Sequence, residues 1–175
     1  MKRHAFILIL SALLALLSHG SAAQTKDRPE LLFTAAGDWK TFFAGRDVRS
    51  RSLGYMTSLD LEWKNFVFGL SFDSGIKDRW MNYYNFFLGG RFGYRVPAGK
   101  WGFAPFVREG WLCDLSPKGS CGQDRSDAFL SCVGLETDYN IYENCRLFLS
   151  AQGLFDGKDS PGFSVSAGFK VILKK

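Results

Sequence analysis

The chain has 175 residues, a length that suits a single domain, and a formal net charge of +5. Acidic and basic residues are interspersed along it, with no basic run beyond a small cluster at Arg46, Arg49 and Arg51. This distribution argues against the continuous basic face of a nucleic-acid-binding protein.

The first residues have the three-part layout of a secretory signal peptide. Lys2 and Arg3 precede an apolar run over 5–17, and small residues follow at 21–23. The run is too short for a membrane-spanning helix, which needs about 20 residues. We predict a signal peptide over 1–23 and a mature domain over 24–175. Both histidines leave with the signal peptide, and with them the usual general base and the commonest metal ligand.

The mature chain alternates apolar and polar residues almost throughout, which is typical of strands with one buried face. In "YYNFFLGGRFGYRV", for example, aromatic residues and Leu88 alternate with glycines and arginines. No segment has a convincing helical stripe. In chain order, the predicted strands are 31–42, 54–64, 66–74, 82–96, 100–112, 128–140, 145–155 and 162–174.

The fifth predicted strand is the least regular. Pro105 cannot donate to a strand ladder, so we expect a bulge or edge irregularity there. The directions in which Arg108 and Glu109 point are therefore left open.

Short and long connections alternate around the chain. Only Asn65 separates the second strand from the third, while "VPAG" and "NIYEN" make two further tight turns. The other four connections are longer and polar: "FAGRDVRSRSL", "SGIKDRW", "CDLSPKGSCGQDRSD" and "DGKDSPG". This alternation is typical of an eight-stranded, antiparallel, up-and-down transmembrane β-barrel with short periplasmic turns and longer extracellular loops.

Alternation alone permits two opposite barrels. A soluble carrier turns its apolar face inward around a ligand, and a membrane barrel turns it outward to lipid. The motifs "GDW" at 37–39 and "TDY" at 137–139 resemble short lipocalin signatures, which keeps a soluble lipocalin-like carrier of a small hydrophobic ligand as the alternative. That resemblance stops at the C-terminus, because lipocalins have a long helix there and this chain ends in a strand.

Two patterns favour lipid. The polar face is rich in serine and in Gly69, Gly89, Gly93, Gly134 and Gly168, which suit the crowded interior of a narrow barrel. Amphipathic aromatic residues gather near strand ends, where they suit the two membrane interfaces: Trp39, Tyr55, Trp63, Tyr94, Trp101, Trp111 and Tyr139.

The C-terminal "SAGFKVIL" resembles the assembly signal of outer-membrane barrels, although Val171 stands where an aromatic residue is usual. Over its mature length the chain resembles the small eight-stranded outer-membrane barrels, such as the OmpW family and the OmpA transmembrane domain. The resemblance implies a bacterial outer-membrane location, outer-membrane lipid as surroundings and insertion by the barrel-assembly machinery. It also implies a non-enzymatic role, either porin-like passage of small solutes or structural and surface contact.

On this register the lumen receives six acids and five bases that must pair, since unpaired buried charges are costly. They are Asp38, Lys40, Asp60, Glu62, Lys64, Asp73, Arg91, Arg95, Glu136, Asp138 and Lys170. Either an internal plug or a selective path for solutes fits this set, and eight strands leave little free bore for the path.

The opposite face of the strands is expected to meet lipid. Its residues are Phe66, Phe68, Leu70, Phe72, Tyr84, Phe86, Leu88, Phe92, Phe163, Val165, Phe169 and Val171. In the extracellular loops, a basic set could meet lipopolysaccharide phosphates or other surface polyanions: Arg46, Arg49, Arg51, Lys77 and Arg79.

The cysteines predict one disulfide and no metal site. Cys113 and Cys121 flank a turn-rich loop, and an exported protein can keep a disulfide. Cys132 and Cys145 lie at different heights of the predicted hairpin and are harder to pair. No cysteine pair has the spacing of a zinc knuckle. No cofactor is expected, and "SGIK" at 74–77 lacks the partner motifs of a penicillin-binding enzyme.

Overall fold

The computed structural model describes residues 28–44, 47–76, 84–118, 122–155 and 161–174. This part of the chain consists of strands and turns, and it contains no helix that is long and apolar enough to cross a membrane. The strands are β1 (Glu30–Ala44), β2 (Asp47–Trp63), β3 (Phe66–Ile76), β4 (Tyr84–Tyr94), β5 (Val96–Ala98), β6 (Trp101–Lys118), β7 (Gly122–Tyr142), β8 (Cys145–Phe155) and β9 (Pro161–Lys174).

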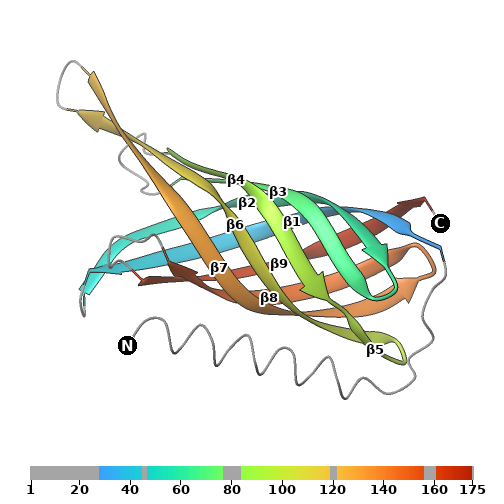
Figure 1. The fold of residues 1–175 in the computed structure, drawn as a ribbon. Coiled ribbons are helices and arrows are strands. Elements are labelled where there is room, and N and C mark those ends of the chain that lie inside the picture. The colour runs from blue at the N-terminus through green and yellow to red at the C-terminus, as the bar shows by residue number, and fades with distance from the viewer. Residues whose placement is uncertain (1–27, 45–46, 77–83, 119–121, 156–160, 175) are drawn as a thin grey trace.

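The strands close into an antiparallel barrel (Figure 1). Each long strand pairs with its neighbours in the chain, β1 also pairs with β9, and β4 pairs with β6. The short β5 continues the course of β4 and pairs with the start of β6. The predicted eight-stranded up-and-down barrel is confirmed, with β5 as one extra strand.

Tight turns connect the strands at one end of the barrel, which we call the short-turn end. Trp63 pairs with Phe66, so the β2–β3 turn consists of Lys64 and Asn65. Both have a positive φ, 48° and 71°, as a type I′ hairpin turn requires. Gly99, with a φ of 65°, occupies the corresponding turn before β6. Lys64 therefore belongs to a turn, not to the strand predicted at 54–64.

At the other end, the hairpin end, two predicted loops are largely strand. β1 and β2 stay paired as far as Ala44 and Asp47, and β6 and β7 as far as Lys118 and Gly122. The β6–β7 hairpin projects well beyond the barrel wall (Figure 1). Two paired strands can continue into water with polar residues on both faces. The point at which apolar alternation stops in the sequence is therefore not the point at which the strands stop pairing.

The other strand boundaries agree with the prediction at some strands and differ at others. β8 has the predicted limits, Cys145–Phe155. The single strand predicted at 82–96 is divided into β4 and β5 at Arg95. Pro105 stands in an unbroken β6–β7 register opposite Leu135, while its other side faces the break between β4 and β5. The expected irregularity therefore lies in the neighbouring strand, at the break between β4 and β5. Pro105 has no backbone N–H to donate on that side, and the break leaves no acceptor that needs one.

The two faces of the wall have opposite chemistry. Large apolar side chains lie on the outside, where Leu70 is 67% and Trp111 63% exposed. Charged side chains lie inside, where Lys40 and Asp73 are each 1% exposed. A soluble carrier has the reverse arrangement, so the lipocalin-like alternative is wrong for this barrel.

Aromatic pairs mark both ends of the outer face. Trp101 lies near Tyr139 towards the short turns, with ring centroids 4.8 Å apart, and Trp111 packs edge-on against Phe129 near the hairpin end. The two tryptophans are ten positions apart along β6, which is roughly 25 Å for a strand tilted as in membrane barrels. This is the height of the apolar band that such barrels present to lipid.

Candidate functional site

The interior of the barrel is the candidate site, because it collects the buried charges of the described residues. Seven acids and six bases there are almost fully shielded from solvent. Each of the seven carboxylates lies within 4.0 Å of a basic nitrogen, so the charges are compensated locally. The ion pairs form three groups that follow one another along the barrel axis.

The first group lies at the short-turn end. Arg146, just after the last short turn, reaches Glu62 at 2.6 Å and Glu30 at 3.1 Å. Arg95 donates two hydrogen bonds to Asp138, at 2.7 and 2.8 Å, and lies 3.7 Å from Glu62. Three acids and two bases thus form a continuous chain across this mouth.

The second group lies one step deeper along the same strands. Arg91 donates to Glu136 at 2.8 Å and lies 3.6 Å from Asp60. Lys170 also pairs with Glu136. Ser58 donates to Asp60 at 2.8 Å, so this group combines two acids and two bases with hydroxyl donors.

The third group lies nearer the hairpin end. Arg108 donates to Asp73 at 2.7 Å, and Lys40 bridges Asp73 to Asp38. Arg108 is also bound to Ser71 at 3.1 Å. Two further hydroxyls, those of Ser164 and Ser166, donate to Asp38 at 2.6 and 2.7 Å.

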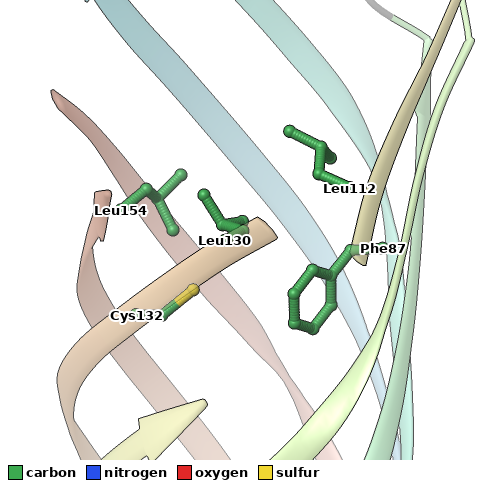
Figure 2. Packing of buried hydrophobic residues seen from close by; sticks show 5 residues of the cluster. All are labelled: Phe87, Leu112, Leu130, Cys132 and Leu154. Atoms are coloured by element: carbon green, nitrogen blue, oxygen red, sulfur yellow. The ribbon is translucent and has the colours of Figure 1, made fainter. Parts of the chain in front are cut away.

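An apolar cluster lies in the lumen beside the third group. Its members are Phe87, Leu112, Leu130, Cys132 and Leu154, each at most 6% exposed. Figure 2 shows their side chains within the space that the strands enclose. The guanidinium of Arg108 lies over the ring of Phe87, 4.6 Å from its centroid, and so joins the cluster to the ion pairs. Phe87 is also the register partner of Asp73, and Cys132 that of Arg108, so the cluster lies directly beside the third group.

Glycines make room for these side chains. A Cβ on Gly69 would lie 1.9 Å from Asp60, and one on Gly102 would lie 2.4 Å from the Arg95 guanidinium. A Cβ on Gly89 or Gly134 would meet the ring of Phe87 or Phe106 at 2.5–2.6 Å. The small residues of the polar face therefore hold space for the long ones.

The structure buries every predicted lumen residue except Lys64. Lys64 is exposed in its turn, 5.0 Å from the Trp63 ring centroid, because the reversal of the chain ends the alternation one residue earlier than predicted. The prediction also missed Glu30, Arg108 and Arg146. Glu30 and Arg146 stand an even number of residues from the other inward-facing residues of β1 and β8, so alternation alone could have placed them in the lumen. For Arg108, the irregularity expected at Pro105 left the direction of the side chain undecided.

The predicted lipid-facing residues lie on the outer face wherever their side chains are described. Several are strongly exposed, including Leu88 at 61% and Phe169 at 46%. Tyr84 belongs to β4, but its side chain lies outside the described part. Glu109, left open by the sequence, is exposed on this face.

The predicted basic loop set is only partly described. Arg49 and Arg51 belong to β2 instead of a loop, and the Arg51 side chain is exposed. Arg46, Lys77 and Arg79 lie outside the described residues. Cys121 does too, so its disulfide with Cys113 stays a prediction. Cys132 and Cys145 are both free thiols.

The chemistry of the lumen is that of a filled interior. Among the described residues, no group of three histidine, cysteine, aspartate or glutamate side chains is placed to bind a metal ion. A cavity between the second and third groups has only about 10 Å³ for the centre of a water-sized molecule. Ion pairs and the apolar cluster occupy the space around it.

No family model and no curated protein sequence matches the chain. Solved structures do. Neisserial surface protein A has a TM-score of 0.72 at 11% identity, over 82% of this chain and 97% of its own. Ail of Yersinia pestis in complex with the heparin analogue sucrose octasulfate has a TM-score of 0.58 at 10% identity, over 81% and 97%. The N-terminal β-barrel domain of Pseudomonas aeruginosa OprF has a TM-score of 0.52 at 16% identity, over 82% and 99%.

The fold predicted from alternation and turn lengths is therefore confirmed, and the chain has the architecture of the small eight-stranded outer-membrane β-barrels.

Proposed function

We propose that this protein is a non-enzymatic outer-membrane barrel with a closed lumen, which anchors its hairpins for contact at the cell surface. The observation that carries the proposal is the filling of the lumen: three groups of ion pairs and an apolar cluster leave space for about one water molecule. A filled barrel provides a rigid anchor, and the parts left for contact with other molecules lie at its ends.

Location in the outer membrane rests on the chemistry of the wall. The exposed apolar residues cover a band with aromatic pairs at both ends, which suits lipid and its two interfaces. Residues 1–23 would direct export and leave 24–175 as the mature domain. The short turns would then face the periplasm and the projecting β6–β7 hairpin the outside, as in bacterial barrels of this kind.

A conducting path is disfavoured by the contacts inside. An ion entering from the short-turn end meets Arg95 and Arg146, both held by carboxylates. Beside the third group it meets the apolar cluster, which provides no groups to replace the water around an ion. Passage of solutes would require both layers to rearrange.

The test is single-channel recording in planar bilayers. The mature protein should give no steady unitary steps, while the same preparation shows a heat-dependent gel shift that proves it is folded. Steps of constant height that change in the Arg91→Ala variant would overturn the closed lumen, because Arg91 lies at its centre.

Within this role, we propose that the basic residues of the β1–β2 hairpin bind surface polyanions. Arg49 and Arg51 lie on β2 close to the hairpin end, and Arg51 is exposed. Arg46, Lys77 and Arg79 would add to the set if they lie nearby. The similar barrel Ail was solved with a heparin analogue bound, which supports trying this class of ligand.

Heparin retention of the folded protein tests the polyanion proposal. The Arg49→Ser/Arg51→Ser variant should elute at lower salt, because each lost contact to a polyanion reduces the release of counterions. The matched control is Lys64→Ser/Lys100→Ser, which removes the same charge from exposed positions at the short-turn end. Equal losses from both variants would mean that heparin responds only to net charge.

A further inference from the structure

Two buried polar atoms of the second ion-pair group have no hydrogen-bond partner among the described residues. These are Nε of Arg91 and Oδ1 of Asp60, in residues that are 6% and 1% exposed. A buried polar group without a hydrogen bond costs about 1–3 kcal/mol, so such atoms in a native interior need an explanation. Arg91 Nε is the more informative of the two, because Arg91 borders a cavity.

The cavity lies between the second and third groups, on the strand pair β4–β6, where Arg91 and Arg108 are register partners. Its wall combines the apolar side chains of Met56 and Phe106 with six polar residues: Ser58, Ser71, Arg91, Arg108, Glu136 and Ser150. The polar residues provide guanidinium and hydroxyl donors as well as carboxylate and hydroxyl acceptors. The volume of about 10 Å³ is at the lower limit for one water molecule.

The charge balance decides what kind of ligand fits. The second group pairs Asp60 and Glu136 with Arg91 and Lys170, and it is neutral. The third group pairs Asp38 and Asp73 with Lys40 and Arg108, and it is neutral as well. An ion placed between two neutral groups would lose its hydration without gaining a countercharge.

We propose that this cavity binds one water molecule that joins the second ion-pair group to the third. The water accepts a hydrogen bond from Arg91 Nε and donates to Glu136 and to a serine oxygen of the lining. Three bonds are the usual number for a buried water, and each partner belongs to a residue that lines the cavity. The two ion-pair groups then act as one continuous polar network, with the water at their junction.

The site also accounts for the small residues beside it. Ser58, Ser71 and Ser150 come from β2, β3 and β8 and converge on the cavity. A larger side chain at any of them would occupy the space of the water and remove a hydroxyl. The serines thus contribute to both the size and the polarity of the site.

A crystal structure of the mature protein in detergent at about 1.8 Å, with crystals soaked in sodium bromide, tests the proposal. We expect one oxygen-sized peak within hydrogen-bonding distance of Arg91 Nε and no anomalous signal there. A bromide signal would identify an anion site instead. An unoccupied cavity in a map that resolves other lumen waters would also overturn the proposal.

A second measurement does not depend on crystals. The Ser150→Val variant should expel the water and lower the urea midpoint of unfolding in lipid vesicles. Ser131→Val is the matched control, because Ser131 shares a rung with the outward-facing Glu109 and Phe155 and lies outside the lumen. If the two variants have equal midpoints, the water contributes nothing and the proposal fails.

Discussion

At the scale of single residues, the central fact is that buried charge is tolerated here only because it is paired. Arg108 illustrates the dependence: it is 3% exposed and contacts Asp73, Ser71 and the ring of Phe87. Removing one partner of a buried pair leaves the other uncompensated, whereas removing both can be nearly neutral. The ion-pair network is therefore sensitive to single changes in a way that an apolar core is not.

We predict that Arg108→Met lowers the free energy of unfolding by about 3–5 kcal/mol, because it leaves two buried carboxylates, Asp38 and Asp73, with Lys40 as their one basic partner in the third group. The double variant Arg108→Met/Asp73→Leu should be more stable than Arg108→Met alone. Urea titrations in lipid vesicles measure both. Strictly additive effects of the two changes would show that the pair is not coupled.

Glycines give a second prediction at this scale. A Cβ on Gly168 would lie 2.1 Å from the backbone oxygen of Ala35, whereas a Cβ on Gly90 would meet nothing within 4 Å. Gly168→Ala must displace a neighbouring strand and should destabilise the barrel. Gly90→Ala should be neutral or stabilise it by up to about 1 kcal/mol, because it restricts the unfolded chain. Equal urea midpoints for the two variants would contradict this interpretation.

At the scale of elements, β6 combines every environment of the barrel. Its inward residue Arg108 holds the third ion-pair group, and its end beyond the barrel wall forms the projecting hairpin. Its outward residues run from Trp101 to Trp111. They include Glu109, whose exposed carboxylate lies two residues before Trp111 in the chain. A carboxylate on a lipid-facing strand is unfavourable, although less so close to the interface.

Glu109→Leu should therefore stabilise the barrel in lipid by at most about 1 kcal/mol, the range for charges near the membrane interface. Glu109→Gln separates the charge from the added apolar area. The measurement is urea unfolding in vesicles. A loss of stability in both variants would mean that Glu109 has a favourable contact on the outer face.

At the scale of the whole molecule, the barrel is turned inside out relative to a soluble protein. Exposed leucines and aromatic residues cover the wall, while lysines, arginines and carboxylates fill the interior. In water the outer face would be an apolar patch far larger than the few hundred Å² that soluble monomers tolerate. The fold should consequently depend on an apolar solvent around it.

The mature chain, diluted from urea, is expected to form its sheet only in detergent micelles or lipid vesicles. Folded samples should also migrate differently on gels before and after boiling. Circular dichroism and the gel shift measure the two properties. A clear, folded monomer in plain buffer would contradict a membrane location.

Much of this structure could be predicted because alternation is a local property. Successive strand side chains point to opposite faces, so the parity of Asp38, Asp60, Arg91 and Glu136 placed them together before any contact was known. Turn length gave the up-and-down order. Counting every second residue gives the wrong face where the chain leaves the regular ladder. Lys64 was therefore assigned to the lumen although it lies in a turn, and the direction of Arg108, beyond Pro105, was not predicted.

The sequence by itself determined the strand pattern, the eight-stranded class and the separation of a polar face from an apolar one. The glycines and the interfacial aromatic residues also favoured the polar face as the inner one, whereas the tertiary structure decided how far the hairpins extend and which charge meets which. These depend on closure of the barrel, which brings Arg146 of β8 to Glu30 of β1 and Glu62 of β2 across the lumen. Such contacts join residues far apart in the chain, and the period of a single strand contains no information about them.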